Sequence, residues 1–232
     1  MSVNFDKDRA EKFTERILAN PNSSQVGVIA NDLLREYHRG YPVENLRSLL
    51  ANGDESIVIT GAWIASELGA KGIPLLADIS RLIGHPQKKV RFSVIDCLLV
   101  WAGPSNQAEL ASVIGLLSDP EAGVRWKVMD FLSRATPEQL AAAYSFFEVT
   151  QPNSENARGL AWLIGVRATD PQEIRIALQS QEEEFRKYAV VAARRMGRVN
   201  PELLRYASSL NDPDVKNFAD SSIALLDGPH VN

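Results

Sequence analysis

Histidine and cysteine are the side chains most often used for metal binding and nucleophilic catalysis, and this chain has three histidines and one cysteine. His38, His85 and His230 are far apart and never four residues apart, so no helix presents the histidine pair of a zinc protease. Cys97 lies in the apolar run VIDCLLVW, where a thiol behaves as a small hydrophobic side chain. We therefore expect no catalytic residue, no metal site and no cofactor.

The composition indicates a folded chain with no general attraction to polyanions. The 232 residues are 45% hydrophobic and carry a formal charge of -4. A negative total disfavours nucleic acid and anionic membranes as partners. One basic cluster near the C-terminus, partly offset by Glu182, Glu183 and Glu184, runs against this trend: Arg186, Lys187, Arg194, Arg195, Arg198 and Arg205.

The sequence also predicts the location of the protein. No apolar run approaches the roughly 20 residues needed to cross a bilayer. The charged beginning MSVNFDKDRAEKF does not resemble a signal peptide. We expect no membrane contact and a cytoplasmic location.

A turn ending in proline, followed by an apolar residue and a cation, recurs along the chain. GHPQKKVRF, SDPEAGVRW and NDPDVKNFA place Val90-Arg91, Val124-Arg125 and Val215-Lys216 at equivalent positions. Fainter copies are Ala157-Arg158 and Phe185-Arg186, and Val58 begins a copy without the cation. The six anchors 58, 90, 124, 157, 185 and 215 are separated by 32, 34, 33, 28 and 30 residues. This spacing is typical of a repeat made of two short helices.

The residues after each anchor follow a helical period. The fourth residue is small or β-branched in every copy: Ala62, Val94, Val128, Ala161, Ala189 and Ala219. The seventh and eighth residues are mostly apolar, for example Cys97 and Leu98. A stripe at these positions predicts second helices that pack closely on neighbouring units.

LLSDPEAGVRWKVMDFLSRA resembles a HEAT repeat, whose units carry Asp-Pro at the turn and Val-Arg at the start of the second helix. The resemblance is strongest at 106–135, good at 73–102 and 201–226, and poor at 137–167. It implies an all-α fold, a right-handed α-solenoid of about seven antiparallel helix pairs forming one domain over 1–232. Within it, we expect a capping pair at 1–42, repeats at 43–226 and a tail at 227–232.

The resemblance also implies a ladder of charges between neighbouring units. By this correspondence the ladder acids are Asp119 and Asp212. The ladder cations are Arg91, Arg125, Arg158, Arg186 and Lys216. His85 stands where its unit should have the acid.

Solenoids of this class usually serve as scaffolds that bind partners on the concave face, which the second helices line. The residues that we expect on this face are Glu67, Phe92, Asp96, Trp126, Asp130 and Arg194. Aromatic side chains next to acids are typical of a protein interface with central anchors. The loop REYHRGYPVEN, with Tyr37, His38 and Tyr41, is a second candidate surface.

The sequence thus predicts a non-enzymatic protein that binds another protein. The most specific hypothesis is a bacterial immunity or inhibitor protein that neutralises a toxin, and an adaptor or scaffold subunit is an alternative. A further alternative is a HEAT-like DNA glycosylase, which the resemblance would place at Trp126 and Asp130, with Lys127 and Arg134 beside them. A glycosylase requires DNA affinity that falls steeply with salt, whereas a scaffold or inhibitor does not.

Overall fold

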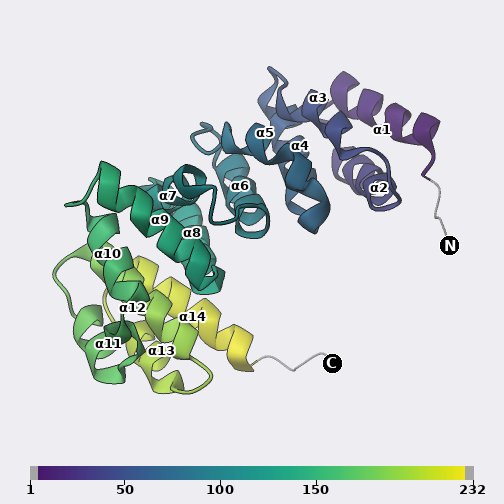
Figure 1. Cartoon of the computed structure of the whole chain (residues 1–232). Helices are drawn as coiled ribbons and strands as arrows, with labels where there is room; N and C mark the ends of the chain where they lie inside the picture. The colour runs from purple at the N-terminus through teal and green to yellow at the C-terminus, as the bar shows by residue number, and fades with distance from the viewer. Residues whose placement is uncertain (1–4, 228–232) are drawn as a thin grey trace. The chain divides into compact units, whose positions relative to one another are not determined.

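The computed structural model describes residues 5–227, and the prediction of an all-α fold is confirmed for them (Figure 1). Fourteen α-helices form seven consecutive hairpins within the described residues, and no strand is present there. The predicted tail and His230 lie outside this range, apart from Asp227 at the end of the last helix. No helix among residues 5–227 is both long and apolar enough to span a bilayer.

The chain divides into two compact units, residues 1–102 and 103–232. The expectation of a single domain over 1–232 stays a prediction.

Unit 1 contains three hairpins joined by short 3₁₀ segments, Val43–Leu46 and Gly69–Leu75. Helix α4 contacts α2, α3 and α6, so each hairpin packs on the next one along the chain. Trp101 fixes the last hairpin, because its indole nitrogen donates to the Gly69 carbonyl at 2.7 Å and its ring covers Gly72. The helices of unit 1 are α1 (Lys7–Ala19), α2 (Val26–His38), α3 (Arg47–Leu50), α4 (Glu55–Ser66), α5 (Leu76–Ser80) and α6 (Lys88–Trp101).

Unit 2 contains four hairpins, and its helices begin at side chains suited to capping. Thr136 and Gln139 form a reciprocal capping box at α9, and Ser154 and Asp170 cap α10 and α11. The helices of unit 2 are α7 (Gln107–Gly115), α8 (Ala122–Arg134), α9 (Pro137–Thr150), α10 (Glu155–Ile164), α11 (Pro171–Leu178), α12 (Glu183–Met196), α13 (Pro201–Ser208) and α14 (Pro213–Asp227).

Contacts in unit 2 extend beyond consecutive hairpins. Helix α9 packs on α7, and α10 packs on α9 and α12, as expected for neighbours in a stack. Helix α8, however, also lies directly against α12 and α14, which belong to hairpins two and three further along. Unit 2 is therefore closed on itself through α8, α12 and α14.

The predicted packing stripe is buried in five of its six copies. Ala62, Val94, Val128, Ala189 and Ala219 have at most a trace of exposed surface. The prediction is wrong for the copy in α10, where Ala161 is exposed and Ile164 is 41% exposed. Helix α10 instead buries Gly159, Leu160 and Leu163. This copy belongs to the segment 137–167, where the resemblance to a HEAT repeat is poorest. It lies between α8 and α12 in the chain, and these two helices contact each other directly.

Candidate functional site

The repeated cations bind the turns that precede their own helices. Arg125 donates from Nη1 to the carbonyls of Asp119 and Pro120, at 2.8 and 3.1 Å. Arg91 donates to the equivalent carbonyls of His85 and Pro86, at 2.7 and 2.8 Å. Arg186 donates in the same way to the carbonyls of Ser180 and Gln181, and Arg158 donates to the carbonyl of Asn153. The spacing of five residues from Pro86 to Arg91 and from Pro120 to Arg125 therefore has a local cause, which the expected ladder did not include.

The residue before each of these turn prolines accepts a hydrogen bond from the backbone amide two residues later, at the start of the second helix. Asp119 Oδ1 accepts from the Glu121 amide at 2.9 Å, and Asp212 Oδ1 accepts from the amides of Asp214 and Val215. His85 takes the same role, because its Nδ1 accepts from the Gln87 amide at 3.1 Å. Imidazole thus replaces carboxylate as the acceptor at that turn.

The cations differ in their further partners. Arg186 reaches the next hairpin and pairs with Asp212, Nε to Oδ2, at 2.7 Å. Arg158 pairs with Glu182 at 2.8 Å on the surface. Lys216 bonds within its own hairpin, to the Ser208 carbonyl and Asp220.

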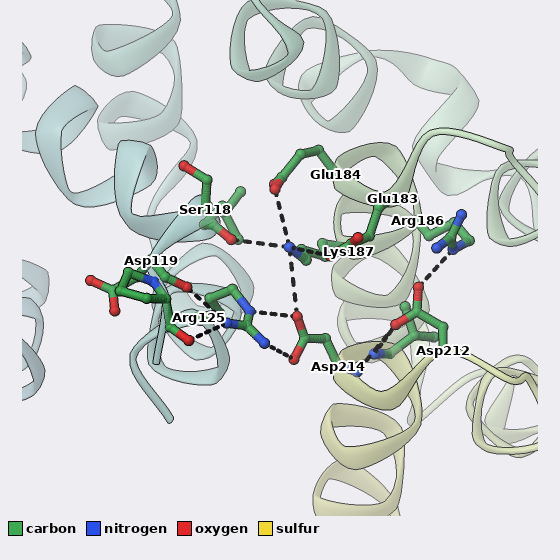
Figure 2. A network of polar contacts seen from close by, with 12 residues as sticks. Ser118, Asp119, Arg125, Glu183, Glu184, Arg186, Lys187, Asp212 and Asp214 are labelled. Carbon is green, nitrogen blue, oxygen red and sulfur yellow. Dashed lines mark hydrogen bonds and ion pairs between the residues drawn. The ribbon is translucent and has the colours of Figure 1, made fainter. Parts of the chain in front are cut away.

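Arg125 takes part in a mostly buried polar cluster, which we call the charged junction: Arg125, Glu183, Glu184, Lys187 and Asp214, of which only Glu183 is largely exposed (Figure 2). Arg125 makes a bidentate pair with Asp214, Nε–Oδ2 2.6 Å and Nη2–Oδ1 2.9 Å. Lys187 is 1% exposed, and its Nζ lies 3.1 Å from a carboxylate oxygen of both Glu183 and Glu184 and 3.6 Å from Asp214. The same Nζ donates to the Leu117 carbonyl at 3.1 Å. The charged junction thus connects α12 to the turn between α7 and α8.

The electrostatics of the charged junction favour the charged forms of its bases. Burial by itself would lower the pKa of the Lys187 ammonium, but Glu184 and Glu183 outweigh it and the pKa is raised. The hydrogen bond to Asp214 likewise raises the pKa of Arg125. Lys187 and Arg125 therefore stay protonated at neutral pH. The charged junction thus stabilises the contact of α8, α12 and α14 and does not act in proton transfer.

Sequence reasoning missed Asp214 as the partner of Arg125 and Lys187 as a second cation near the same carboxylate. A ladder between neighbouring units predicts short sequence separations, whereas Arg125 and Asp214 are 89 residues apart. The available signal was Asp214 itself, an acid directly after the Pro213 turn.

Trp126 and Asp130 lie one turn apart on α8, half-buried, as their spacing predicts. The Trp126 ring meets Phe218 of α14 edge to face, with centroids 6.0 Å apart. Trp126 also lines a pocket of about 210 Å³ with Ala122, Gly123, Asp214 and Asn217. We call these residues, together with Phe218 and Asp130, the Trp126 patch.

Cations of the same helix hold the Asp130 carboxylate. Its Oδ2 lies 3.4 Å from Lys127 Nζ and 3.2 Å from Arg134 Nη1. Arg194, the other predicted site residue of unit 2, lies half-buried near the end of α12.

The remaining predicted site residues belong to unit 1. Phe92 is 36% exposed on α6, Asp96 follows it one turn later, and Glu67 is exposed at the end of α4. Burial, with contributions from Asp96 and Glu67, raises the pKa of the Cys97 thiol, so both acids act on the same part of α6. Phe92, Asp96 and Glu67 thus belong to unit 1, whereas the Trp126 patch belongs to unit 2.

In the alternative surface at 37–45, the two tyrosines are buried, whereas His38 and most of the other residues are exposed. Tyr37 and Tyr41 are 1% and 5% exposed, and their rings lie 5.3 Å apart. Among residues 5–227, no three His, Cys, Asp or Glu side chains gather as metal ligands would.

No family model matches the sequence, and no curated protein is significantly similar to it. Among solved structures, the crystal structure of an engineered protein from the Northeast Structural Genomics Consortium aligns over 79% of this chain and 95% of its own, with a TM-score of 0.41 and 15% identity.

Proposed function

We propose that this chain is a non-enzymatic, HEAT-type repeat protein that binds a partner protein, with Trp126 as an anchor of the interface. The observation that carries the proposal is the setting of Trp126. One side of its ring rests on Phe218, while another lines a pocket among the exposed residues Ala122, Gly123 and Asn217.

A tryptophan in this setting has the properties of a binding hot spot. Its position is fixed by packing before a partner arrives, so little side-chain entropy is lost on association. Small flanking residues leave space for a partner side chain. Asp130, oriented by Lys127 and Arg134, adds a fixed charge one turn away that selects among partners.

Within this proposal, the specific role is that of an inhibitor or immunity protein that occludes a partner toxin. Asp130 and, in unit 1, Asp96 would face basic groups on that partner. An adaptor role uses the same surface but leaves the activity of the partner unchanged. Inhibition of the purified partner therefore separates the two roles.

The test is capture of a partner from lysate of the source organism, followed by affinity measurement with two matched variants. Trp126→Ala should weaken binding at least tenfold. Trp162→Ala is the control, because Trp162 is also a half-buried tryptophan in an aromatic pair, with Phe185 at 5.4 Å. Thermal unfolding of both variants shows whether they remain folded.

Two outcomes contradict the proposal. Equal affinity of the wild type and a folded Trp126→Ala variant would exclude Trp126 as an anchor. Retention of DNA alone, with affinity falling steeply with salt and excision activity lost in Asp130→Asn, would indicate a glycosylase instead.

A further inference from the structure

Apart from Arg194, which is half-buried on α12, the basic cluster near the C-terminus has two kinds of members. Three of its cations are used inside unit 2: Lys187 in the charged junction, Arg186 with Asp212, and Arg195 with the carbonyls of Leu132 and Ala135 at the end of α8. Arg198 and Arg205 are different, because among the described residues neither bonds to another hairpin, and both are exposed and line one pocket.

This pocket, which we call the α14 end pocket, has a volume of about 400 Å³. Its lining combines two guanidinium groups with an aliphatic wall and is completed by Gly197: Arg198, Pro201, Arg205, Ile223, Leu225 and Leu226. Leu225 is 65% exposed although it is large and apolar. The pocket does not overlap the charged junction or the Trp126 patch.

The charges at the rim favour an anion. Among the side chains that the structure describes, Arg198 has no carboxylate within ion-pair distance, and Arg205 pairs only with Glu202, one turn earlier on α13. That pair is exposed on both sides, so it holds the guanidinium weakly. Helix α13 begins at Pro201 without a side-chain cap, so its positive end also lies at the rim.

The aliphatic wall limits the size of the apolar part of a ligand. Ile223 and Leu226 are three residues apart on α14, which is about 4.5 Å along a helix axis. That length accommodates one aliphatic side chain, whereas an extended acyl chain of a dozen carbons is about three times as long. Planar guanidinium groups match carboxylate geometry, which favours a carboxylate as the charged part.

We propose that the α14 end pocket binds the C-terminal residue of a peptide chain, with its α-carboxylate on Arg198 and Arg205 and an apolar side chain against Ile223, Leu225 and Leu226. This site is independent of the Trp126 patch. It gives the protein a second means of recognising a partner, through the free end of that partner.

The test uses calorimetric titration of the full chain with N-acetylated tripeptides that differ only in the last residue. A peptide ending in leucine with a free carboxylate should bind at least tenfold more tightly than its C-terminal amide and than a peptide ending in lysine. The double variant Arg198→Gln, Arg205→Gln should lose the binding, and Leu225→Ser should weaken it. Arg167→Gln, on an exposed arginine paired with Glu173 outside the pocket, is the matched control and should bind as the wild type does.

Three results would overturn the proposal. The first is no heat of binding with any free-carboxylate peptide at millimolar concentration. The second is equal binding of the acid and the amide, which would remove the role of the carboxylate. The third is equal or tighter binding of a free short-chain aliphatic acid, which would identify a small molecule rather than a chain end as the ligand.

Discussion

Lys187 has almost no contact with solvent, yet three carboxylates surround its ammonium group. Removing a charge from such a cluster leaves the opposite charges buried without compensation, which costs more than the ion pair gains in isolation. The second oxygen of Glu184 already has no hydrogen-bond partner in the described structure. Loss of the Lys187 charge therefore leaves Glu184 and Asp214 without one of their buried partners.

We expect Lys187→Met to destabilise the protein by about 3–5 kcal/mol, because Glu184 and Asp214 lose a buried partner. Urea unfolding followed by circular dichroism measures the change. The control is Lys216→Met, whose pair with Asp220 is about half exposed and should contribute less than about 1 kcal/mol. Equal effects of the two substitutions would show that Lys187 is not held as described.

Cys97 should be unreactive in the folded protein. Burial and the neighbouring Asp96 raise the pKa of its thiol well above the usual value, so at pH 8 the thiol stays protonated and shielded. An aromatic disulfide reagent should modify it fully in denaturant and hardly at all under native conditions. Rapid modification of the native protein would contradict the burial.

At the scale of the helix, α10 approaches α12 closely at Gly159. A β-carbon on Gly159 would lie 2.2 Å from the Tyr188 ring, and Tyr188 is buried with its hydroxyl donating to Asn156 at 2.9 Å. The ring cannot move without losing that hydrogen bond. Gly159 is therefore required by packing, not by its backbone conformation.

Gly159→Ala should lower the free energy of unfolding by about 1–3 kcal/mol, the usual cost of overpacking a core. Gly115→Ala is the matched control in α7, because nothing lies within 4 Å of its added β-carbon. That change should be neutral or stabilising by up to about 1 kcal/mol, since alanine favours the helix. Chemical unfolding of both variants measures these changes in the free energy of unfolding. A Gly159→Ala protein as stable as the wild type would contradict the close contact.

The sequence predicted helices more reliably than it predicted their partners. The recurring turn and stripe are local signals, and the seven hairpins follow from them. The pairing of Arg125 with Asp214 could not be predicted in this way, because it depends on how α8 meets α14 across 89 residues. Likewise, the spacing placed Trp126 and Asp130 on one helix face, but Phe218 behind the ring and the two cations on Asp130 required the three-dimensional structure.

At the scale of the molecule, unit 2 differs from an array in which each hairpin contacts only its neighbours. In such an array a lost contact has local effects. In unit 2 the first and last hairpins meet through α8 and α14, so disturbing either should loosen the whole unit.

Arg125→Met should therefore accelerate amide hydrogen exchange in α8, α12 and α14 together, while α4 and α6 of unit 1 keep their protection. Arg158→Met is the comparison, because the Arg158–Glu182 pair is about half exposed and joins only consecutive hairpins. Its effect should stay within α10 and the turn before α12. Exchange measured by mass spectrometry resolves these segments, and a response confined to α8 in Arg125→Met would contradict the closure.

The contact of α14 with α8 has a consequence for how this chain can change in length. Repeat proteins commonly grow by duplication, since each new copy adds to an open end of the stack. In unit 2 the surface of α8 that faces α14 is already occupied by the last hairpin, so a duplicated hairpin inserted before it would displace α14 and separate Arg125 from Asp214. The number of hairpins in this unit is thus set by closure, and selection should tolerate substitutions in it far better than insertions of whole repeats.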